Sequence, residues 1–138
     1  DGLVELFAHA GPAWTKHSSL PGGDFSNQAS LQAQLNNNYP WLPIELCARY
    51  VRSYGTLSYQ LLSEARVLAD LGQHFGAGLY ALEINYLVAH EWARSVDDIL
   101  WRRSKLGLLM SPTEEATLAD YLHTLELCEA SAKPLKPV

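Results

Sequence analysis

Apolar residues recur at helical spacing through most of the 138-residue chain, and no window alternates with the two-residue period of a strand for long enough to predict a sheet. The predicted helices cover residues 26–38, 43–54, 57–68, 79–92, 96–106 and 112–128. Pro43 and Pro112 suit the first position of a helix, and Gly55 suits the end of one. The pattern therefore predicts an all-α fold, a compact bundle of five or six helices.

Residues 1–25 do not share this pattern. They are rich in Pro and Gly and resemble a linker or an extended arm that crosses a surface. We therefore expect two parts, an N-terminal arm over 1–25 and a helical domain over 26–138. A turn-rich connection, DLGQHFGAG, is expected at 70–78.

The stretch from His90 to Gly107 is the most unusual in the chain. Ser95 and Asp98 have the spacing of a capping box, and Gly107 is expected to end the helix that follows. One face of that helix would carry Val96, Ile99, Leu100, Arg103 and Leu106. A charged residue seldom enters an apolar stripe without a partner.

Two interpretations of this stretch are open. In the first, the helix only lays its long cations over the edge of the core. In the second, Trp101, Arg102 and Lys105 form a basic docking face for another domain or an anionic surface, with Arg102 facing out and free. The second interpretation also expects Arg103 to be partly buried and to form a structural ion pair with Glu91, while Asp97 and Asp98 are other nearby candidate partners.

Composition narrows the classes of function. A net charge of -5 argues against nucleic acid as the main partner. No apolar run approaches the ~20 residues of a membrane span, and no signal peptide is expected. The absence of an initiator Met suggests a fragment of a longer protein. Cys47 and Cys128 lack metal-ligand spacing, and we interpret them as reduced core residues in a reducing, cytoplasmic setting.

Motifs of known chemistry are incomplete in this sequence. The glycines of GQHFGAG do not have dinucleotide-binding spacing, and no strand is predicted before them. His90 and Glu91 begin a zinc-protease motif, but Arg94 stands where the second His would be. No local signature marks a nucleophile. We therefore assign no catalytic, cofactor-binding or metal-ligating residue to this chain.

Five landmarks occur in one order: LPGGDF (20–25), YPWLP (39–43), ARYVRSYGT (48–56), DLGQHFGAGLYALEINYLVAHEWA (70–93) and DDILWRRSKLGL (97–108). Together they resemble the C-terminal region of the aerobic, FAD-dependent glycerol-3-phosphate dehydrogenases, from about Gly11 to Leu122. The resemblance implies a parent flavoprotein, peripheral to the cytoplasmic side of the inner membrane, that oxidises sn-glycerol 3-phosphate to dihydroxyacetone phosphate and passes electrons to quinone.

The same resemblance implies that FAD is bound by the preceding domain and that this part alone is inactive, a structural or docking domain. Its expected partner is the parent's own flavin domain, with an anionic membrane surface as a further candidate. Oligomerisation is left open. Two alternatives remain: a freestanding helical interaction module without a redox role, and, with less support, a small metal-dependent enzyme.

Overall fold

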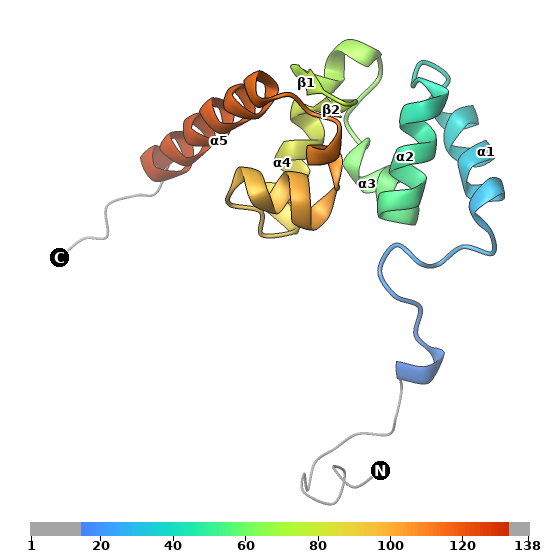
Figure 1. Cartoon of the computed structure of the whole chain (residues 1–138). Helices are drawn as coiled ribbons and strands as arrows, with labels where there is room; N and C mark the ends of the chain where they lie inside the picture. The colour runs from blue at the N-terminus through green and yellow to red at the C-terminus, as the bar shows by residue number, and fades with distance from the viewer. Residues whose placement is uncertain (1–14, 133–138) are drawn as a thin grey trace, which may run out of the picture.

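The computed structural model describes residues 15–132. This part contains five α-helices and one small sheet, so the expected helical fold is confirmed (Figure 1). The helices are α1 (Gln28–Asn38), α2 (Ile44–Tyr54), α3 (Ser58–Leu61), α4 (Ala81–His90) and α5 (Pro112–Ala132).

Helices α1 and α2 pack against each other and follow the predicted boundaries closely (Figure 1). The side chain of Asn27 caps α1 by accepting a hydrogen bond from the Ser30 amide at 2.8 Å. Pro43 lies just before α2 rather than inside it. Gly55 ends α2 as expected, with a φ of 56° that favours glycine.

The turn-rich stretch at 70–78 contains a β-hairpin that the sequence did not predict. Strands β1 (His74–Gly76) and β2 (Leu79–Tyr80) pair antiparallel, with His74 opposite Tyr80. Ala77 and Gly78 both have positive φ, at 48° and 74°, as a two-residue hairpin turn requires. Strands this short cannot display a two-residue period in the sequence.

Two expected helices differ in the structure. Helix α3 is a single turn, and Leu68 belongs to a separate 3-10 helix, Leu68–Leu71. The helix after Ser95 is largely a π-helix, Asp98–Arg103, and it ends before Lys105, whose φ is 62°. Gly107 therefore does not end this helix. It lies in the next 3-10 helix, Leu106–Leu108.

The core lies between α1, α2, α4, the π-helix and the first half of α5. Helix α4 is central as predicted, because Ile84 and Leu87 are completely buried. Cys47 is also buried, with a free thiol whose pKa is raised by burial. Cys128 lies in α5, but its side chain is outside the described residues.

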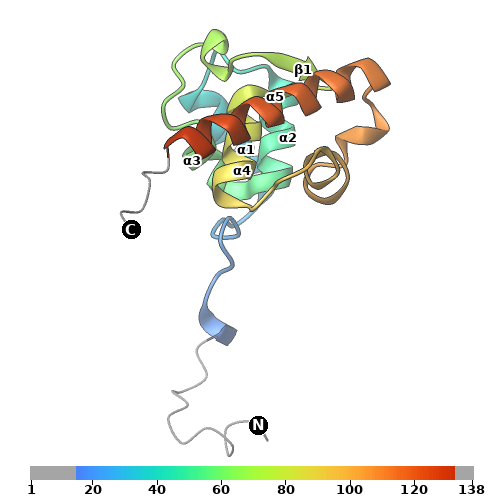
Figure 2. The same cartoon turned by 90° about the vertical axis from the view of Figure 1, so that its left-hand side faces the viewer.

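Helix α5 runs across one side of the body (Figure 2). Its capping box is present as predicted: the Ser111 amide donates to Glu114 at 2.7 Å, and the Glu114 amide donates to the Ser111 hydroxyl at 3.4 Å. The rings of Phe75 in β1 and Tyr121 in α5 lie 5.0 Å apart, centroid to centroid. This contact helps to hold α5 against the hairpin. No helix among the described residues has the length and hydropathy needed to cross a bilayer.

The segment before α1 leaves the body on the side where α2 ends (Figures 1 and 2). Of the expected arm, residues 1–14 lie outside the described residues, as does the tail 133–138. The described part of the arm includes a 3-10 turn, Thr15–His17, and the loop 20–25. This loop is the part that contacts the helical body.

Candidate functional site

The contact between the arm and the body is a close approach of two backbones. The Thr56 amide donates to the Gly22 carbonyl at 3.1 Å, and the Thr56 hydroxyl donates to the Asp24 carboxylate. A Cβ on Gly55 would lie 1.9 Å from the Gly22 carbonyl oxygen, so no side chain fits there. Gly22 also has a positive φ of 81°. These two glycines fix the loop 20–25 against the end of α2, and we call this contact the glycine corner.

A groove of about 380 Å³ opens beside the glycine corner. One wall is the loop that begins at Leu20, another is the end of α2 with Arg52 and Tyr54, and Glu91 lines it from the end of α4. Residues far apart in the sequence therefore meet on the side from which the arm leaves. We call this side, made by loop 20–25, Arg52, Tyr54, Glu91 and Trp92, the arm-side face.

Under this face lies a buried ion pair that the sequence analysis missed. Glu83 of α4 has no exposed surface, and its carboxylate accepts two hydrogen bonds from the Arg49 guanidinium, at 2.7 and 2.5 Å. The Tyr54 hydroxyl donates to the same carboxylate at 2.6 Å, and Arg49 also donates to the Gly78 carbonyl at 2.7 Å. The cluster therefore joins α2, α4 and the hairpin turn.

Burial keeps the Tyr54 hydroxyl protonated in this cluster. Burial first, and then the negative charge of Glu83, raise the pKa of Tyr54 far above its ordinary value. The phenol therefore stays protonated and acts as a hydrogen-bond donor. Because Tyr54 also lines the groove, the cluster fixes part of the groove wall. Arg49, Tyr54 and Glu83 all fall in the landmarks ARYVRSYGT and LYALEINYLVAHEWA, but nothing in local spacing shows that they meet.

The structure places Arg103 next to Glu91, with 3.9 Å between Nη1 and Oε2. Their side chains are 37% and 29% exposed, so this is a partly solvated pair rather than a buried one. Arg103 is less buried than the spacing predicted, because a π-helix turns by a smaller angle per residue than an α-helix and moves its later side chains off the apolar face.

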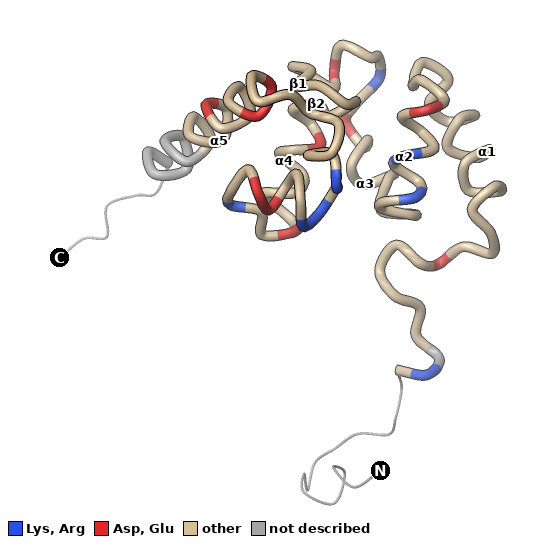
Figure 3. The backbone as a smooth tube through the Cα atoms, viewed as in Figure 1, with Lys and Arg blue, Asp and Glu red and all other residues tan. Residues whose placement is uncertain are grey.

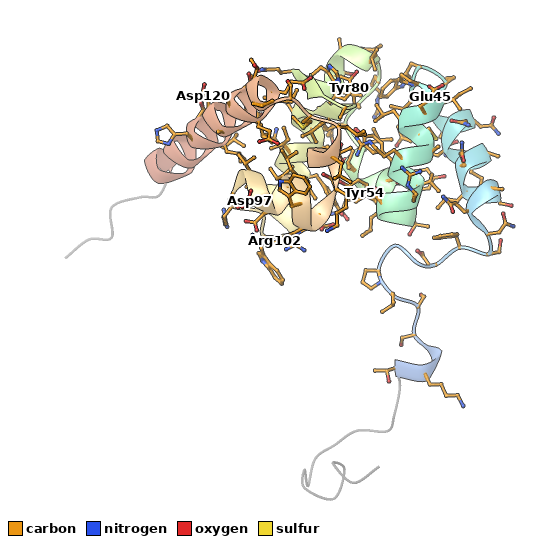
Figure 4. All side chains as sticks on the ribbon, viewed as in Figure 1. Glu45, Tyr54, Tyr80, Asp97, Arg102 and Asp120 are labelled. Atoms are coloured by element: carbon orange, nitrogen blue, oxygen red, sulfur yellow. The ribbon has the colours of Figure 1, made fainter. Side chains whose placement is uncertain are left out.

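The three residues proposed for docking have exposed side chains and lie in the π-helix or just after it. Arg102 faces out at 66% exposure, but it is not free: it forms an ion pair with Asp98 at 2.5 Å (Figure 4). Trp101 lies over Gly107, since a Cβ there would come within 2.6 Å of the indole ring. Lys105 follows the end of the π-helix in a left-handed conformation. Trp101 and Lys105, four residues apart, would share one side of an α-helix, but the structure has a π-helix here that ends at Arg103.

Charged groups on the arm-side face are mixed in sign. Figure 3 shows Lys and Arg on α2 and on the stretch between α4 and α5, with acidic residues beside them. Arg102 and Arg103 are each paired with a carboxylate of the same chain. One cation of the predicted basic docking face, Arg102, is therefore neutralised within the chain.

The predicted capping box at Ser95 is present and includes this ion pair. Asp98 accepts from the amides of Arg94 at 3.0 Å and Ser95 at 3.1 Å, and its own amide donates to the Ser95 hydroxyl at 3.2 Å. The Arg94 amide, followed by Arg102 and Ser95, lowers the pKa of the Asp98 carboxyl well below its usual range.

The glycine-rich hairpin does not fit a flavin or its phosphates. The space beside Gly76 is filled by the Glu114 carboxylate, which would repel a phosphate. The Gly78 carbonyl is already bonded to Arg49. In the described part of the chain, no three His, Cys, Asp or Glu side chains are grouped as metal ligands.

Comparison with known proteins gives one consistent result. Residues 13–125 match the family model described as the C-terminal domain of alpha-glycerophosphate oxidase. The chain is 50% identical over 123 residues to a glycerol-3-phosphate dehydrogenase of Pseudomonas aeruginosa, covering 88% of this chain and 24% of that protein. It is 40% identical over 121 residues to the aerobic glycerol-3-phosphate dehydrogenase of Escherichia coli, covering 87% and 24%.

A third relative bears on the choice of substrate. The D-erythritol 1-phosphate dehydrogenase of Brucella abortus is 35% identical over 127 residues, covering 91% of this chain and 25% of that protein. The chain thus spans about a quarter of the length of the curated relatives that it matches. The resemblance drawn from the five landmarks is confirmed. The chain belongs to the family of C-terminal domains of alpha-glycerophosphate oxidase.

Proposed function

We propose that this chain is the C-terminal helical domain of an FAD-dependent dehydrogenase that oxidises sn-glycerol 3-phosphate to dihydroxyacetone phosphate. The match over residues 13–125, together with two relatives named for glycerol 3-phosphate, is the observation that carries the proposal. In this proposal the preceding part of the protein binds FAD and substrate. The domain described here contributes no reacting group and serves as a structural and docking unit.

The electron acceptor and the location follow from the same resemblance. Electrons pass from FAD to a quinone, and the whole enzyme is peripheral to the cytoplasmic side of the inner membrane. Both statements rest on the landmark sequences shared with the aerobic enzymes. For the domain itself, the mixed charges of the arm-side face support docking on protein rather than on lipid.

Purification of the full-length protein tests the activity. We expect a yellow protein with flavin absorbance that reduces a redox dye when sn-glycerol 3-phosphate is added, and that also reduces a soluble quinone analogue. D-erythritol 1-phosphate is the matched comparison, because one relative is named for it. If the enzyme turned over D-erythritol 1-phosphate faster than sn-glycerol 3-phosphate, the proposed substrate would be wrong. The proposed reaction, an FAD-dependent dehydrogenation, would stand.

The isolated chain provides the second part of this test. We expect it to bind no FAD and to oxidise neither compound, because Glu114 and Arg49 already occupy the surroundings of its glycine-rich turn. A full-length protein without flavin and without dehydrogenase activity would contradict the proposal. It would favour the alternative, a helical protein-interaction module without a redox role.

A further inference from the structure

Trp92 has an unusual combination of backbone and exposure. Its φ is 55°, in the left-handed region, and its side chain is 79% exposed. Helices commonly end with one left-handed residue, and glycine usually occupies that position because it has no Cβ. Here the tryptophan follows directly after Glu91, the C-cap of α4, and the turn lets the Ala93 amide donate to the Leu87 carbonyl at 3.1 Å.

The turn would therefore form more easily with glycine. A tryptophan adds steric cost to the backbone, and at this exposure little packing within the described fold offsets that cost. What it does provide is a large aromatic surface directed at solvent. Aromatic side chains of this kind, beside a groove, are typical anchors of protein interfaces.

Leu20 is the matching feature on the other side of the groove. It is also 79% exposed, and it belongs to the loop held by the glycine corner. Glu91 and Leu20 both line the groove, and Trp92 follows Glu91 directly in the chain. An exposed leucine on the groove wall and an exposed tryptophan next to a residue of that wall provide apolar surface that another protein can cover.

The direction of the chain identifies the occupant. The family model describes a C-terminal domain, and the relatives are about four times as long as this chain, so most of such a protein precedes the arm. The arm leaves the body on the same side as the groove, and its own residues build one wall (Figures 1 and 2). A preceding domain attached through this arm is thus held next to the arm-side face.

We infer that the arm-side face is the docking surface for the preceding, flavin-binding part of the same protein, with Trp92 and Leu20 as its apolar anchors. This inference rests on the proposed function. Glu91 is paired with Arg103, so this carboxylate is not left as an unpaired charge when a protein surface covers the face. The docking area lies around the groove, and Trp101 lies outside it.

The test uses the full-length protein with a specific protease site inserted after Lys16, in the exposed part of the arm. After cleavage, size-exclusion chromatography shows whether the C-terminal piece still elutes with the flavin-containing piece. We expect the two pieces of the otherwise wild-type protein to stay together. Trp92→Gly and Leu20→Ser should each weaken the association at least tenfold, as truncation of an interface anchor does.

Leu109→Ser is the matched control for Leu20→Ser, because Leu109 is also a leucine and is 74% exposed, but it does not line the groove. It should leave the association unchanged. Misfolding cannot explain a loss in Trp92→Gly, since glycine suits the left-handed turn. Its thermal midpoint should equal or exceed that of the wild type.

Two results would overturn the inference. One is separation of the two wild-type pieces after cleavage. The other is association of the Trp92→Gly and Leu20→Ser pieces as tight as that of the wild type, and if these variants also lost binding to lipid vesicles, the two side chains would be assigned to a membrane. Neither depends on the proposed chemistry, because flavin absorbance and dye reduction are measured separately on the uncut protein.

Discussion

Glu83 shows how a single buried charge can decide the packing of several elements. Its carboxylate has no exposed surface and depends on Arg49 and Tyr54 for all its side-chain partners in the described structure. We expect Glu83→Ala to lower the free energy of unfolding by about 3–5 kcal/mol, because it leaves Arg49 as a buried, unpaired cation. Tyr54→Phe should cost less, about 1.5–3 kcal/mol, since it removes one hydrogen bond to a charged group.

Urea unfolding of the chain and its variants measures both losses. Glu64→Ala is the control, because Glu64 is exposed and such substitutions stay within about 0.5 kcal/mol. If Glu83→Ala fell within the range of that control, the ion pair would not hold α2 and α4 together.

The structure changes the expected effects on stability of replacing Arg102 and Arg103 in the π-helix. From the spacing alone, Arg103→Ala is expected to strand a buried carboxylate and to destabilise the isolated domain, and Arg102→Ala to leave it nearly unchanged. Because Glu91 and Arg103 are both partly solvated, we now expect each of Arg102→Ala and Arg103→Ala to change stability by less than about 1 kcal/mol. A loss well above this for Arg103 alone in thermal melting would restore the original assignment.

At the scale of elements, carboxylates cap the ends of several helices. Asp98, Asp70 and Glu114 each accept backbone amides, and these hydrogen bonds lower their pKa values. A carboxyl whose pKa is lower in the folded chain than in the unfolded chain stabilises the fold. This contribution is complete at pH values above the unfolded pKa, which is about 3.9 for Asp. This stability is lost as the pH falls through the lower, folded pKa.

Asp98→Asn tests the acid dependence of one cap. The variant should be less stable than the wild type at neutral pH, and the difference should shrink as the pH falls below about 4, where the Asp98 carboxyl of the unfolded wild-type chain begins to gain its proton while that of the folded chain is still ionised. Chemical denaturation at several pH values measures this difference. A difference independent of pH would mean that the charge of Asp98 does not contribute.

Residue spacing in the sequence predicted the two capping boxes correctly but missed the hairpin and the π-helix. Both capping boxes, at Ser95 and Ser111, were correct because a capping box is defined by residues three apart. The hairpin was missed because two- and three-residue strands carry no periodic signal. The π-helix was missed because an apolar stripe at α-helical spacing gives no sign of one extra residue per turn.

The candidate site was harder to predict than the fold because its parts are distant in the sequence. Leu20, Tyr54 and Glu91 line one groove, and only the folded chain brings them together. Trp92 was visible in the sequence as a tryptophan before a capping box, but its left-handed backbone was not. The predicted docking residues Trp101, Arg102 and Lys105 were placed on an assumed α-helix, and the structure has a π-helix there that ends before Lys105.

For the molecule as a whole, charge bears on the choice between a protein and a membrane as partner. The chain has 15 Asp and Glu against 10 Lys and Arg. Arg102 and Arg103 are paired internally, and in the described structure Arg52 and Lys105 are nearby cations for which no ion pair is found. A basic residue near an anionic bilayer contributes roughly 1 kcal/mol, so two such residues give only about 2 kcal/mol.

We therefore expect the isolated chain to stay in the supernatant when phosphatidylserine-containing vesicles are sedimented at physiological ionic strength. About 2 kcal/mol is too little for stable binding, since even a millimolar dissociation constant corresponds to about 4 kcal/mol. The variant Arg52→Glu with Lys105→Glu serves as the control and should behave like the wild type. Sedimentation of the wild-type chain with the vesicles, abolished in this variant, would instead show that Arg52 and Lys105 bind lipid and that a membrane is a partner of the domain.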